Sequence, residues 1–437
     1  MASTYLTYTQ QSPSTAEGQK FTLSMWVKKS VNNTTSGLYG NTYDNTHRGY
    51  IYFNAQDTLQ YYDSAGVNYA TTRVFRDNNA FYHIVIAVDT TLSSSSDRIK
   101  FYVNGVRETS FSASSAPNQN DTLKLMNTTN TPNMGRIIEA GTSYYFSGVI
   151  SHVHLTQGYT YDATPFGETD STTGEWKIKT SVTGINYGTN GFWWLKDSIA
   201  TTDHSPNSNT FTVAGGTLTK TEDNPSNVFA TWNPISGRNS SINFTYGNNT
   251  ITNTGADAWN TKYALSTMYF NKGKFYMESK LATSGNVYVG GILMNPSSDT
   301  YSSSLGMTNT GNGLGYYESG TIYLNGTQLQ IGSGSTAITQ GDILGVAADR
   351  DNGTVQFYKN GSTSSPLITT SNGLSTSKEW AFCANWYSGG KLETNFGNGY
   401  FADNTVASAG TNASGNGIFE YDVPTGYTAL STKGLNS

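Results

Sequence analysis

The sequence is poor in cysteine and in charged residues. Cys383 is the one cysteine in 437 residues, so the chain has no intrachain disulfide framework. Charged residues make up 13% of the chain, with a net charge of -5 and no basic cluster, which argues against nucleic acid as a partner. No stretch is apolar enough to span a bilayer, and no N-terminal stretch has the pattern of a signal peptide. We therefore expect no membrane insertion and synthesis in a reducing cytoplasm.

Aromatic residues and small turn-forming residues are abundant. Aromatics make up 13% of the chain, which contains 30 tyrosines and 46 glycines. This composition suits many short strands joined by tight turns, and its aromatic content is too high for a disordered chain. The length permits two well-buried cores. The composition thus predicts an all-β protein.

One unit occurs twice in the chain, at His83–Gly105 and at Gly341–Gly361. Each copy reads as an apolar strand, a turn opened by an aspartate, an alternating strand and an Asn-Gly turn. In the first copy, Ile99, Phe101 and Val103 lie on one face of the alternating strand. The earlier strand is apolar on both faces, as expected where both faces of a strand are covered. Two such copies predict two all-β domains.

Three stretches of the first domain resemble a known sandwich family. They are the alternating strand Phe21–Val27, the first repeated unit His83–Gly105 and the strand Phe146–Leu155. Together they resemble the laminin-G-like, concanavalin A-like sandwich. The segment 161–232 follows, and its run Phe192–Trp194 is too apolar for a loose linker. We therefore expect this segment to pack against the first sandwich.

The second domain resembles a SPRY domain, which is also a concanavalin-like sandwich. The resemblance rests on Gly273–Glu278, Gly341–Asp349, Val355–Gly361 and Asn395–Gly397. The predicted fold class is all-β, with two concanavalin A-like antiparallel β-sandwiches of the jelly-roll type in tandem and a packed connecting segment. The predicted domains are a laminin-G-like sandwich at 1–160, the connecting segment at 161–232, a SPRY-like sandwich at 233–402 and a C-terminal segment at 403–437 that packs on the SPRY domain.

The order of these parts resembles virion proteins of tailed bacteriophages. The resemblance includes the joining pieces Phe166–Glu168 and Asn224–Thr231 and the ending Val423–Leu430. It implies a non-enzymatic structural protein on the virion exterior, an appendage of the fibre, spike or knob type. The implied partners are other virion proteins, further copies of the chain with a homotrimer favoured, and a host-surface polysaccharide. Because no sustained heptad run predicts a coiled-coil stalk, a knob or short spike fits better than a long tail fibre.

Three other interpretations stay open. A capsid decoration or cement protein would stabilise the head and bind no receptor. A glycan hydrolase would need paired carboxylates on one strand face, and concanavalin-like folds include such enzymes. The nearest acids, Glu168, Asp170 and Glu175, lie in a turn-like stretch without an apolar strand, which favours a solvated loop and no enzyme. An intracellular SPRY adaptor fits poorly with a laminin-G-like neighbour.

The sequence gives little support for a metal or a cofactor. His152 and His154 are two apart on one predicted strand, so we expect them on the same face, where a polar outer surface is favoured over a metal site. Asp89 and Asp97 flank a serine run and could hold calcium, but such residues more often open turns and bond their own backbone. We expect no cofactor and leave calcium near these two aspartates open.

The candidate binding residues are aromatic and polar side chains in predicted loops. Glycan sites combine exposed aromatic faces with hydrogen-bonding amides and acids. A glycine- and asparagine-rich loop of the first domain and a loop of the SPRY domain offer such side chains. Because aromatic residues mostly serve in cores or subunit contacts, each candidate competes with a packing role. The candidates are Tyr39, Tyr43, His47, Arg48, Trp386 and Tyr387.

Overall fold

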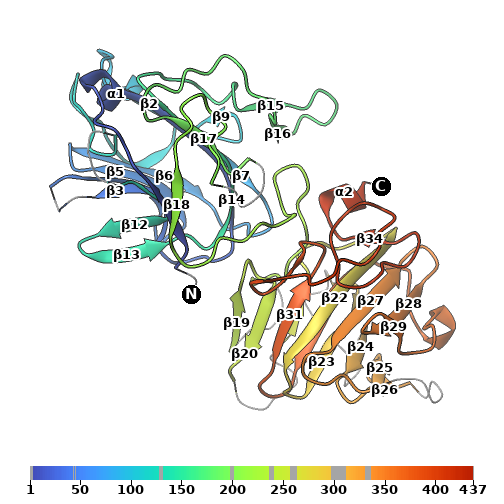
Figure 1. Ribbon diagram of the computed structural model, residues 1–437. Coiled ribbons are helices and arrows are strands. Elements are labelled where there is room, and N and C mark those ends of the chain that lie inside the picture. The colour runs from blue at the N-terminus through green and yellow to red at the C-terminus, as the bar shows by residue number, and fades with distance from the viewer. Residues whose placement is uncertain are drawn as a thin grey trace. The chain divides into compact units, whose positions relative to one another are not determined.

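The computed structural model describes residues 3–42, 44, 46–126, 131–196, 201–235, 241–255, 263–296, 312–329 and 336–436 (Figure 1). It divides into two compact units, the first built from Met1–Lys220 with Asn224–Ser226 and the second from Thr221–Asp223 with Asn227–Ser437. Both units are built almost entirely from antiparallel sheets, which confirms the predicted all-β class. Among the described residues, no helix is long and apolar enough to cross a bilayer.

The first unit is a sandwich of two sheets with two added hairpins and two short helices. The eight-stranded sheet runs β10-β6-β5-β4-β3-β11-β1-β18, with β1 at Tyr5–Tyr8, β3 at Ser36–Thr42, β4 at Arg48–Phe53, β5 at Thr58–Asp63, β6 at Val67–Val74, β10 at Phe111–Ser115, β11 at Asn133–Met134 and β18 at Phe211–Gly215. The six-stranded sheet runs β17-β14-β2-β7-β8-β9, with β2 at Lys20–Lys29, β7 at Tyr82–Asp89, β8 at Ile99–Val103, β9 at Val106–Arg107, β14 at Gly148–Gln157 and β17 at Phe192–Trp194. The remaining elements are the hairpins β12 (Arg136–Glu139) with β13 (Thr142–Tyr145) and β15 (Gly167–Thr169) with β16 (Trp176–Ile178), the helix α1 (Thr15–Gln19) and the 3-10 helix η1 (Ser95–Asp97).

Alternating apolar residues build the core of the first unit. On β2, Phe21, Leu23, Met25 and Val27 point inward, and each side chain is at most 1% exposed. On β7 both faces are buried, because one face lies in the core and Val85 on the other face packs against the segment that follows β14. This confirms the expectation that the apolar strand of the repeated unit is covered on both sides.

The connecting segment packs on the first unit as far as Lys220, as the sequence predicted, and it also extends both sheets. Its predicted end at residue 232 is wrong, because 227–232 belong to the second unit and Trp232 lies in the core of that unit. Phe192 of β17 pairs with Leu155 of β14, and Phe211 of β18 pairs with Tyr8 of β1. The polar N-terminal stretch therefore contains a strand that the sequence pattern did not reveal. The reason is that β1 is short and only Leu6 and Tyr8 join the core.

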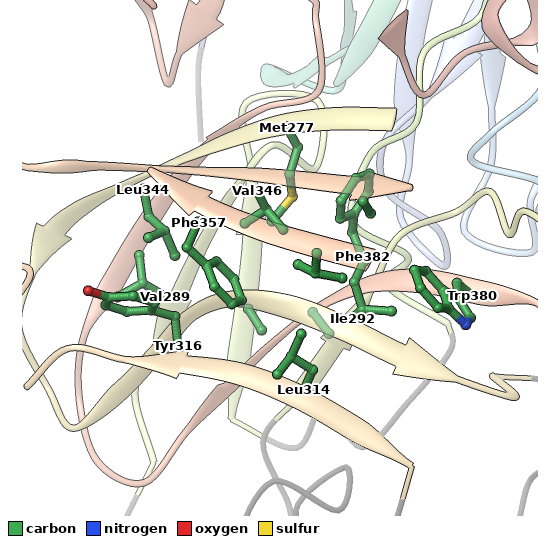
Figure 2. Close-up of a cluster of buried hydrophobic side chains, with 14 of the residues drawn as sticks. Met277, Val289, Ile292, Leu314, Tyr316, Leu344, Val346, Phe357, Trp380 and Phe382 are labelled. Atoms are coloured by element: carbon green, nitrogen blue, oxygen red, sulfur yellow. The ribbon is translucent and has the colours of Figure 1, made fainter. Parts of the chain in front are cut away.

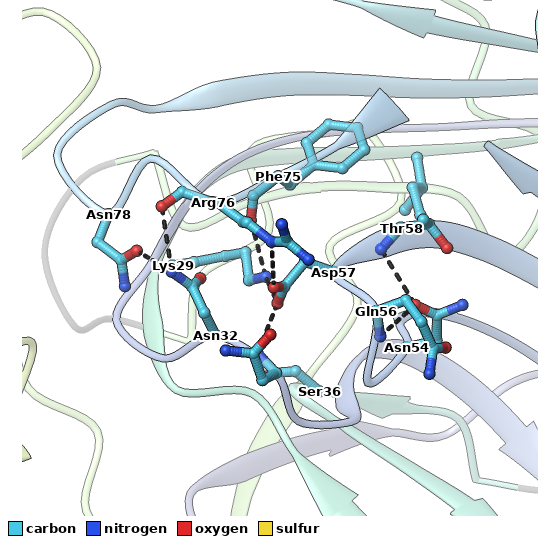
Figure 3. Close-up of polar contacts among 12 residues, drawn as sticks. Lys29, Asn32, Ser36, Asn54, Gln56, Asp57, Thr58, Phe75, Arg76 and Asn78 are labelled. Atoms are coloured by element: carbon cyan, nitrogen blue, oxygen red, sulfur yellow. Dashed lines mark hydrogen bonds and ion pairs between the residues drawn. The ribbon is translucent and has the colours of Figure 1, made fainter. Parts of the chain in front are cut away.

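A buried ion cluster joins three parts of the first unit (Figure 3). Lys29 Nζ, at the end of β2, lies 2.8 Å from Asp57 Oδ1, and both side chains are at most 1% exposed. Arg76 Nε donates to Asp57 Oδ2 at 3.0 Å, and the Asn33 N–H donates to Oδ1 at 2.9 Å. Burial favours the neutral form of Asp57, but the hydrogen bonds from Lys29, Asn33 and Arg76 outweigh burial and lower the pKa of the carboxyl group. The loss of either partner of such a pair would leave an uncompensated buried charge.

The second unit is also a sandwich of two sheets. The eight-stranded sheet runs β19-β20-β31-β22-β27-β28-β29, with β34 paired to β22; the strands are β19 at Ile242–Thr245, β20 at Thr250–Asn253, β22 at Lys274–Thr283, β27 at Ile343–Asp349, β28 at Thr354–Lys359, β29 at Ser362–Thr363, β31 at Lys391–Asn395 and β34 at Thr428–Ala429. The six-stranded sheet runs β21-β30-β23-β24-β25-β26, with β21 at Tyr263–Leu265, β23 at Val287–Met294, β24 at Gly313–Tyr317, β25 at Ile322–Leu324, β26 at Thr327–Gln328 and β30 at Trp380–Trp386. The remaining elements are the hairpin β32 (Tyr400–Phe401) with β33 (Asn404–Thr405), the 3-10 helix η4 (Thr370–Asn372) and the helix α2 (Thr432–Leu435).

The core of the second unit lies between its two sheets, as Figure 2 shows. Met277, Val346 and Phe357 come from the eight-stranded sheet, and Ile292 and Phe382 come from the six-stranded sheet. All five side chains are 0% exposed. The second copy of the repeated unit forms as predicted, with β27 buried on both faces and β28 alternating.

The two Asn-Gly pairs form two-residue hairpin turns, as predicted. In Asn104-Gly105 and Asn360-Gly361 the asparagine φ is 48° and the glycine φ is 78° or 79°, so both central residues are in the left-handed region. Each asparagine Oδ1 also accepts a 2.8 Å hydrogen bond from a backbone N–H near the start of the adjacent strand, His83 of β7 or Ile343 of β27. The two turns are therefore the same in backbone and in side-chain contact.

Candidate functional site

The outer face of the eight-stranded sheet in the first unit carries tyrosines and amides. Since side chains alternate along β4 and β5, every second residue points away from the core. Tyr50 lies opposite Tyr62 in the strand register, and Tyr52 lies opposite Gln60. We call this surface the tyrosine face. It consists of Arg48, Tyr50, Tyr52, Gln60, Tyr62, Asn68, Glu139 and Tyr144.

The rings of the tyrosine face pack on one another. Tyr50 and Tyr62 stack with ring centroids 5.1 Å apart, and Tyr50 meets Tyr52 edge to face at 5.4 Å. The Arg48 guanidinium carbon lies 5.3 Å from the centre of the Tyr62 ring. A hydrogen bond with Tyr62 raises the pKa of Arg48, so the side chain stays cationic. The stacked rings form a stiff surface, because each ring restricts the rotation of the next.

Polar contacts hold the edges of the tyrosine face. The Tyr50 hydroxyl donates to Glu139 Oε1 at 3.0 Å, and burial together with the Glu139 charge raises the pKa of Tyr50. Gln60 Nε2 donates to Asn68 Oδ1 at 2.8 Å, and Asn54 Nδ2 donates to Gln60 Oε1 at 3.4 Å. The amides are thus oriented by one another before any ligand binds.

The hairpin of β12 and β13 covers one side of this sheet face. At Gly37 and Gly40 of β3, a Cβ atom would overlap or crowd atoms of the hairpin, including those of Ile137. Glycine at these positions lets the hairpin lie directly on the strand. Over the neighbouring strands, Gln60 and Tyr62 stay partly exposed. Partly exposed rings beside oriented amides can stack on a sugar ring and bond its hydroxyls.

Of the four binding candidates in the first domain, one lies on the tyrosine face. Arg48 stacks on Tyr62, and His47 is exposed in the turn that precedes β4. The assignment of Tyr39 to an exposed loop is wrong, because the residue belongs to β3, is 1% exposed and has its hydroxyl 3.2 Å from that of Tyr8. Tyr43 lies outside the described residues.

Of the two binding candidates in the SPRY-like domain, one is buried and one is partly exposed. The placement of Trp386 in a loop is wrong, because it is the last residue of β30 and is 0% exposed in the core. Tyr387 follows in a partly exposed loop, where its N–H donates to Asn286 O at 3.0 Å.

Sequence reasoning also missed Tyr50, Tyr52 and Tyr62 of the first domain. The available signal was alternation, since tyrosines two apart on a strand share a face.

The acids that were considered for catalysis lie on a small hairpin. The stretch is not the strandless loop expected from the sequence, because β15 and β16 pair there. Lys177 Nζ lies 3.5 Å from Glu168 and 3.1 Å from Asp170, while Glu175 is exposed. Backbone N–H groups of Thr173 and its neighbour, together with Lys177, lower the pKa of Asp170. A general acid needs a raised pKa instead.

A Ser–His pair in the first unit has the wrong protonation pattern for a catalytic dyad. His83 Nε2 lies 2.8 Å from Ser24 Oγ, and the Trp176 indole N–H donates to His83 Nδ1 at 2.9 Å. Because the indole is only a donor, Nδ1 is unprotonated and Nε2 carries the hydrogen, which it donates to Ser24. Burial lowers the pKa of His83 to about 3, so the ring stays neutral. His83 therefore holds Ser24 and Trp176 in place on this outer face and does not activate Ser24.

The two histidines of β14 do not share a face. The register on β2 places Ser151 opposite Trp26 and His154 opposite Ser24, with an irregularity between them. His152 is the extra residue, with φ 47°, and this bulge cancels the expected two-residue spacing. The expected polar outer surface is also wrong for His154, which is 2% exposed under the connecting segment.

The aspartates considered for calcium make local contacts. Asp89 Oδ1 accepts from the Thr91 N–H at 3.0 Å, as a turn-opening residue does, and Asp89 also pairs with Lys20 at 3.1 Å. Asp97 lies in η1 and contacts Arg107 at 3.3 Å. Within the described ranges, no group of three or more histidine, cysteine, aspartate and glutamate side chains is arranged to hold a metal ion.

Family models match both units of the chain. Residues 2–159 match the model described as the Concanavalin A-like lectin/glucanases superfamily, of the laminin-G type, and residues 274–399 match the SPRY domain. The chain thus carries a concanavalin A-like domain followed by a SPRY domain. No curated protein matches the chain in sequence.

Solved structures similar to this chain include several SPRY domains. The SPRY domain of human HERC1 is 20% identical, with 37% of this chain and 96% of that chain covered and a TM-score of 0.31. The TRIM65 PSpry domain is 17% identical, with 38% and 90% covered and a TM-score of 0.29. A human SPRY domain is 14% identical, with 36% and 94% covered and a TM-score of 0.27.

Proposed function

We propose that the chain is a non-enzymatic structural protein of a tailed-phage particle, an exterior appendage whose first domain binds a host-surface polysaccharide through the tyrosine face. The proposal rests on the partly exposed Tyr62 ring, which stacks on the buried ring of Tyr50 beside oriented amides on one sheet face. Sugar rings stack on aromatic faces, and their hydroxyls pair with amide groups. Protein made in the host cytoplasm would assemble there onto the particle.

The chemistry of the titratable groups supports a role without catalysis. Glu168 and Asp170 share Lys177, and the lowered pKa of Asp170 does not suit a group that must give a proton to a glycosidic oxygen. Ser24 faces a neutral His83 that already donates to it. A binding protein needs neither acid nor nucleophile, and the tyrosine face supplies both stacking and hydrogen bonds.

Assembly into a homotrimer with contacts to other virion proteins is part of the proposal. It is supported by the low charge and the high tyrosine content, because interfaces are enriched in aromatic residues and poor in lysine and glutamate. Closed symmetry is the default for homo-oligomers, and the phage resemblance favours three copies. Light scattering at micromolar concentration should report three chains, and a monomer at every concentration would remove this part of the proposal.

Affinity electrophoresis with the extracted surface polysaccharide of the host tests the binding role. Tyr62→Ala and Gln60→Ala should each weaken binding about fivefold or more, which corresponds to about 1 kcal/mol. Tyr159→Ala is the matched control, since Tyr159 is 42% exposed outside the tyrosine face and should leave binding unchanged. Equal affinity of all three variants and the parent would contradict the assigned site.

Cryo-microscopy of the intact particle tests the location. Density for the chain on the outside of the tail would support the appendage. Density on the capsid surface, together with no polysaccharide binding, would favour the decoration or cement protein instead. Release of soluble sugar that stops in Glu168→Gln or Asp170→Asn would favour a glycan hydrolase.

A further inference from the structure

The last part of the chain lies as a strap on the outer face of the eight-stranded sheet of the second unit. We define the strap as residues 416–430. Near its end, β34 pairs with β22 in parallel register. The Phe419 ring lies 5.1 Å from the Tyr276 ring, and Val423 is buried in the same cluster. The strap therefore covers an apolar sheet face, as the sequence predicted for the C-terminal segment.

One buried carboxylate holds the middle of the strap. Glu278 on β22 is 0% exposed, and its Oε2 accepts from the Glu420 N–H at 2.8 Å. Its Oε1 accepts from the Tyr421 N–H at 2.9 Å and from the Tyr276 hydroxyl at 3.3 Å. Two consecutive backbone N–H groups of the strap thus depend on one side chain of the sheet.

In the part of the second unit that the structure describes, no positive charge pairs with Glu278. Opposite it in the sheet stand Asn395 and Gly345, which are neutral, and the described residues show no ion pair between Glu278 and a lysine or arginine. Lys280, the next residue on this face, is opposite Glu393 in the register. The titratable groups around Glu278 are Tyr276 and Lys280 on β22, Tyr358 on β28, Glu393 on β31, Asp342 before β27, and Glu420 and Tyr421 on the strap.

The protonated form of Glu278 keeps all of these contacts. A neutral carboxyl group still accepts from both strap N–H groups and can donate its own proton to the Tyr276 hydroxyl. The ionised form leaves a negative charge in a dry site next to the like charge of Glu420. Burial, which the backbone hydrogen bonds only partly offset, raises the pKa of Glu278 from 4.5 to about 7.

We propose that Glu278 and the strap form a pH-sensitive latch, in which a proton on Glu278 keeps the strap closed and its loss loosens the strap. The sign follows from linkage, because the group binds its proton more tightly when folded than when exposed. The stabilisation is complete below pH 4.5 and is lost as pH rises through about 7. Opening would expose the apolar surface of Tyr276, Ala347 and Phe419. This inference is independent of polysaccharide binding.

Hydrogen exchange of the full chain tests the latch. After correction for the intrinsic pH dependence of exchange, the protection of the Glu420 and Tyr421 amides should fall on the order of tenfold between about pH 5.5 and 8.5, since one pKa unit is a factor of ten. In Glu278→Gln the protection should be independent of pH, because the amide cannot ionise. Parent protection that is constant or rises with pH would overturn the proposal.

A second pair of variants leaves Glu278 in place and covers the case in which Glu278→Gln fails to fold. Glu420→Gln removes the neighbouring like charge, so the midpoint of loosening should move to lower pH. Asp422→Asn is the matched control, since the Asp422 carboxylate accepts from Thr411 and should leave the midpoint unchanged. Identical midpoints in Glu420→Gln and the parent would show that Glu278 does not control the strap.

Discussion

The two domains build the same four strands around the repeated unit and then cover them differently. In the first domain the strands are β2, β7, β8 and β9, and in the second they are β22, β27, β28 and β29. The first residue of the long strand pairs with the aspartate that opens the turn in both cases, Lys20 with Asp89 at 3.1 Å and Lys274 with Asp349 at 2.9 Å. The glycine of each Asn-Gly turn lies under an aromatic ring, Trp176 or Tyr421.

The difference lies in the outward side chains beneath the cover. At equivalent places on the long strand, the first domain has Ser24, which pairs with a neutral histidine, and the second has the carboxylate of Glu278. The cover of the first domain is the connecting segment, and that of the second is the strap. Apolar pattern and glycine set the strands and the turn in both domains, whereas the polar side chains under the cover differ between them.

The largest effect should come from the buried pair of Lys29 and Asp57 at the end of β2. Asp57→Ala should destabilise the first domain by about 3–5 kcal/mol, because Lys29 would remain buried without its carboxylate. Thr283→Ala, at the matching end of β22, is the control and should change stability by less than about 0.5 kcal/mol. Denaturant titration that follows each domain measures both. A small effect of Asp57→Ala would mean that water reaches Lys29.

The next largest effect should come from the glycines of the two Asn-Gly turns, which lie against Trp176 in the first domain and Tyr421 in the second. Gly105→Ala and Gly361→Ala should each cost about 1–2 kcal/mol for positive φ plus about 1–3 kcal/mol because the new Cβ overlaps the covering ring. Gly141→Ala and Gly426→Ala are matched controls, since their φ values are 81° and 85° and a Cβ there meets nothing within 4 Å. Thermal unfolding of the four variants separates the cost of positive φ from the cost of overlap with the ring. Equal losses in variants and controls would show that the rings move aside.

The smallest effect concerns pH, and its sign for His83 in the first domain is opposite to that for Glu278 in the second. The pKa of His83 is lowered from 6.5 to about 3. The stability that the neutral ring contributes to the first domain is therefore complete above pH 6.5 and is lost as pH falls toward 3. Relative to the parent, His83→Gln should lessen the loss of first-domain stability between about pH 7.5 and 5.5 by about 1 kcal/mol. Asp63, also in the first domain, has the opposite effect. Burial raises its pKa to about 6, so the stability that its protonated form contributes is lost as pH rises through about 6. An identical pH profile for His83→Gln and the parent would mean that the histidine is hydrated.

The fold was largely predictable because its signals are local. Alternation located β2, β8 and β28, continuous apolar runs located β7 and β27, and the Asn-Gly pairs located their turns. The strand β1 was missed, because with two buried positions it has no periodicity of its own. It is a strand only because Leu6 pairs with Met134 on one side and with Val213 on the other. Such long-range pairing leaves no local pattern.

The candidate site was predicted less well, because exposure depends on tertiary packing. Tyr39 and Tyr50 are both tyrosines of neighbouring strands, yet one points into the core and the other onto the tyrosine face. The bulge at His152 changed which side chains share a face, and no sequence feature marks it. Arg48 was predicted in a glycine- and asparagine-rich loop, whereas it is the first residue of β4 and lies against the Tyr62 ring.

The pairing of β1 with β18 also determines when the first domain can be complete. Tyr5 is opposite Gly215 in the register, so the edge strand β18 pairs with a strand that is separated from it in sequence by most of the domain. A ribosome must release β18 before β1 gains its second neighbour, and until then the strand has an open edge toward solvent. Closure across such a long chain is slow, because the entropy of the intervening loop must be lost first. Chains that end before Gly215 should therefore have a less stable first domain than chains that end after it.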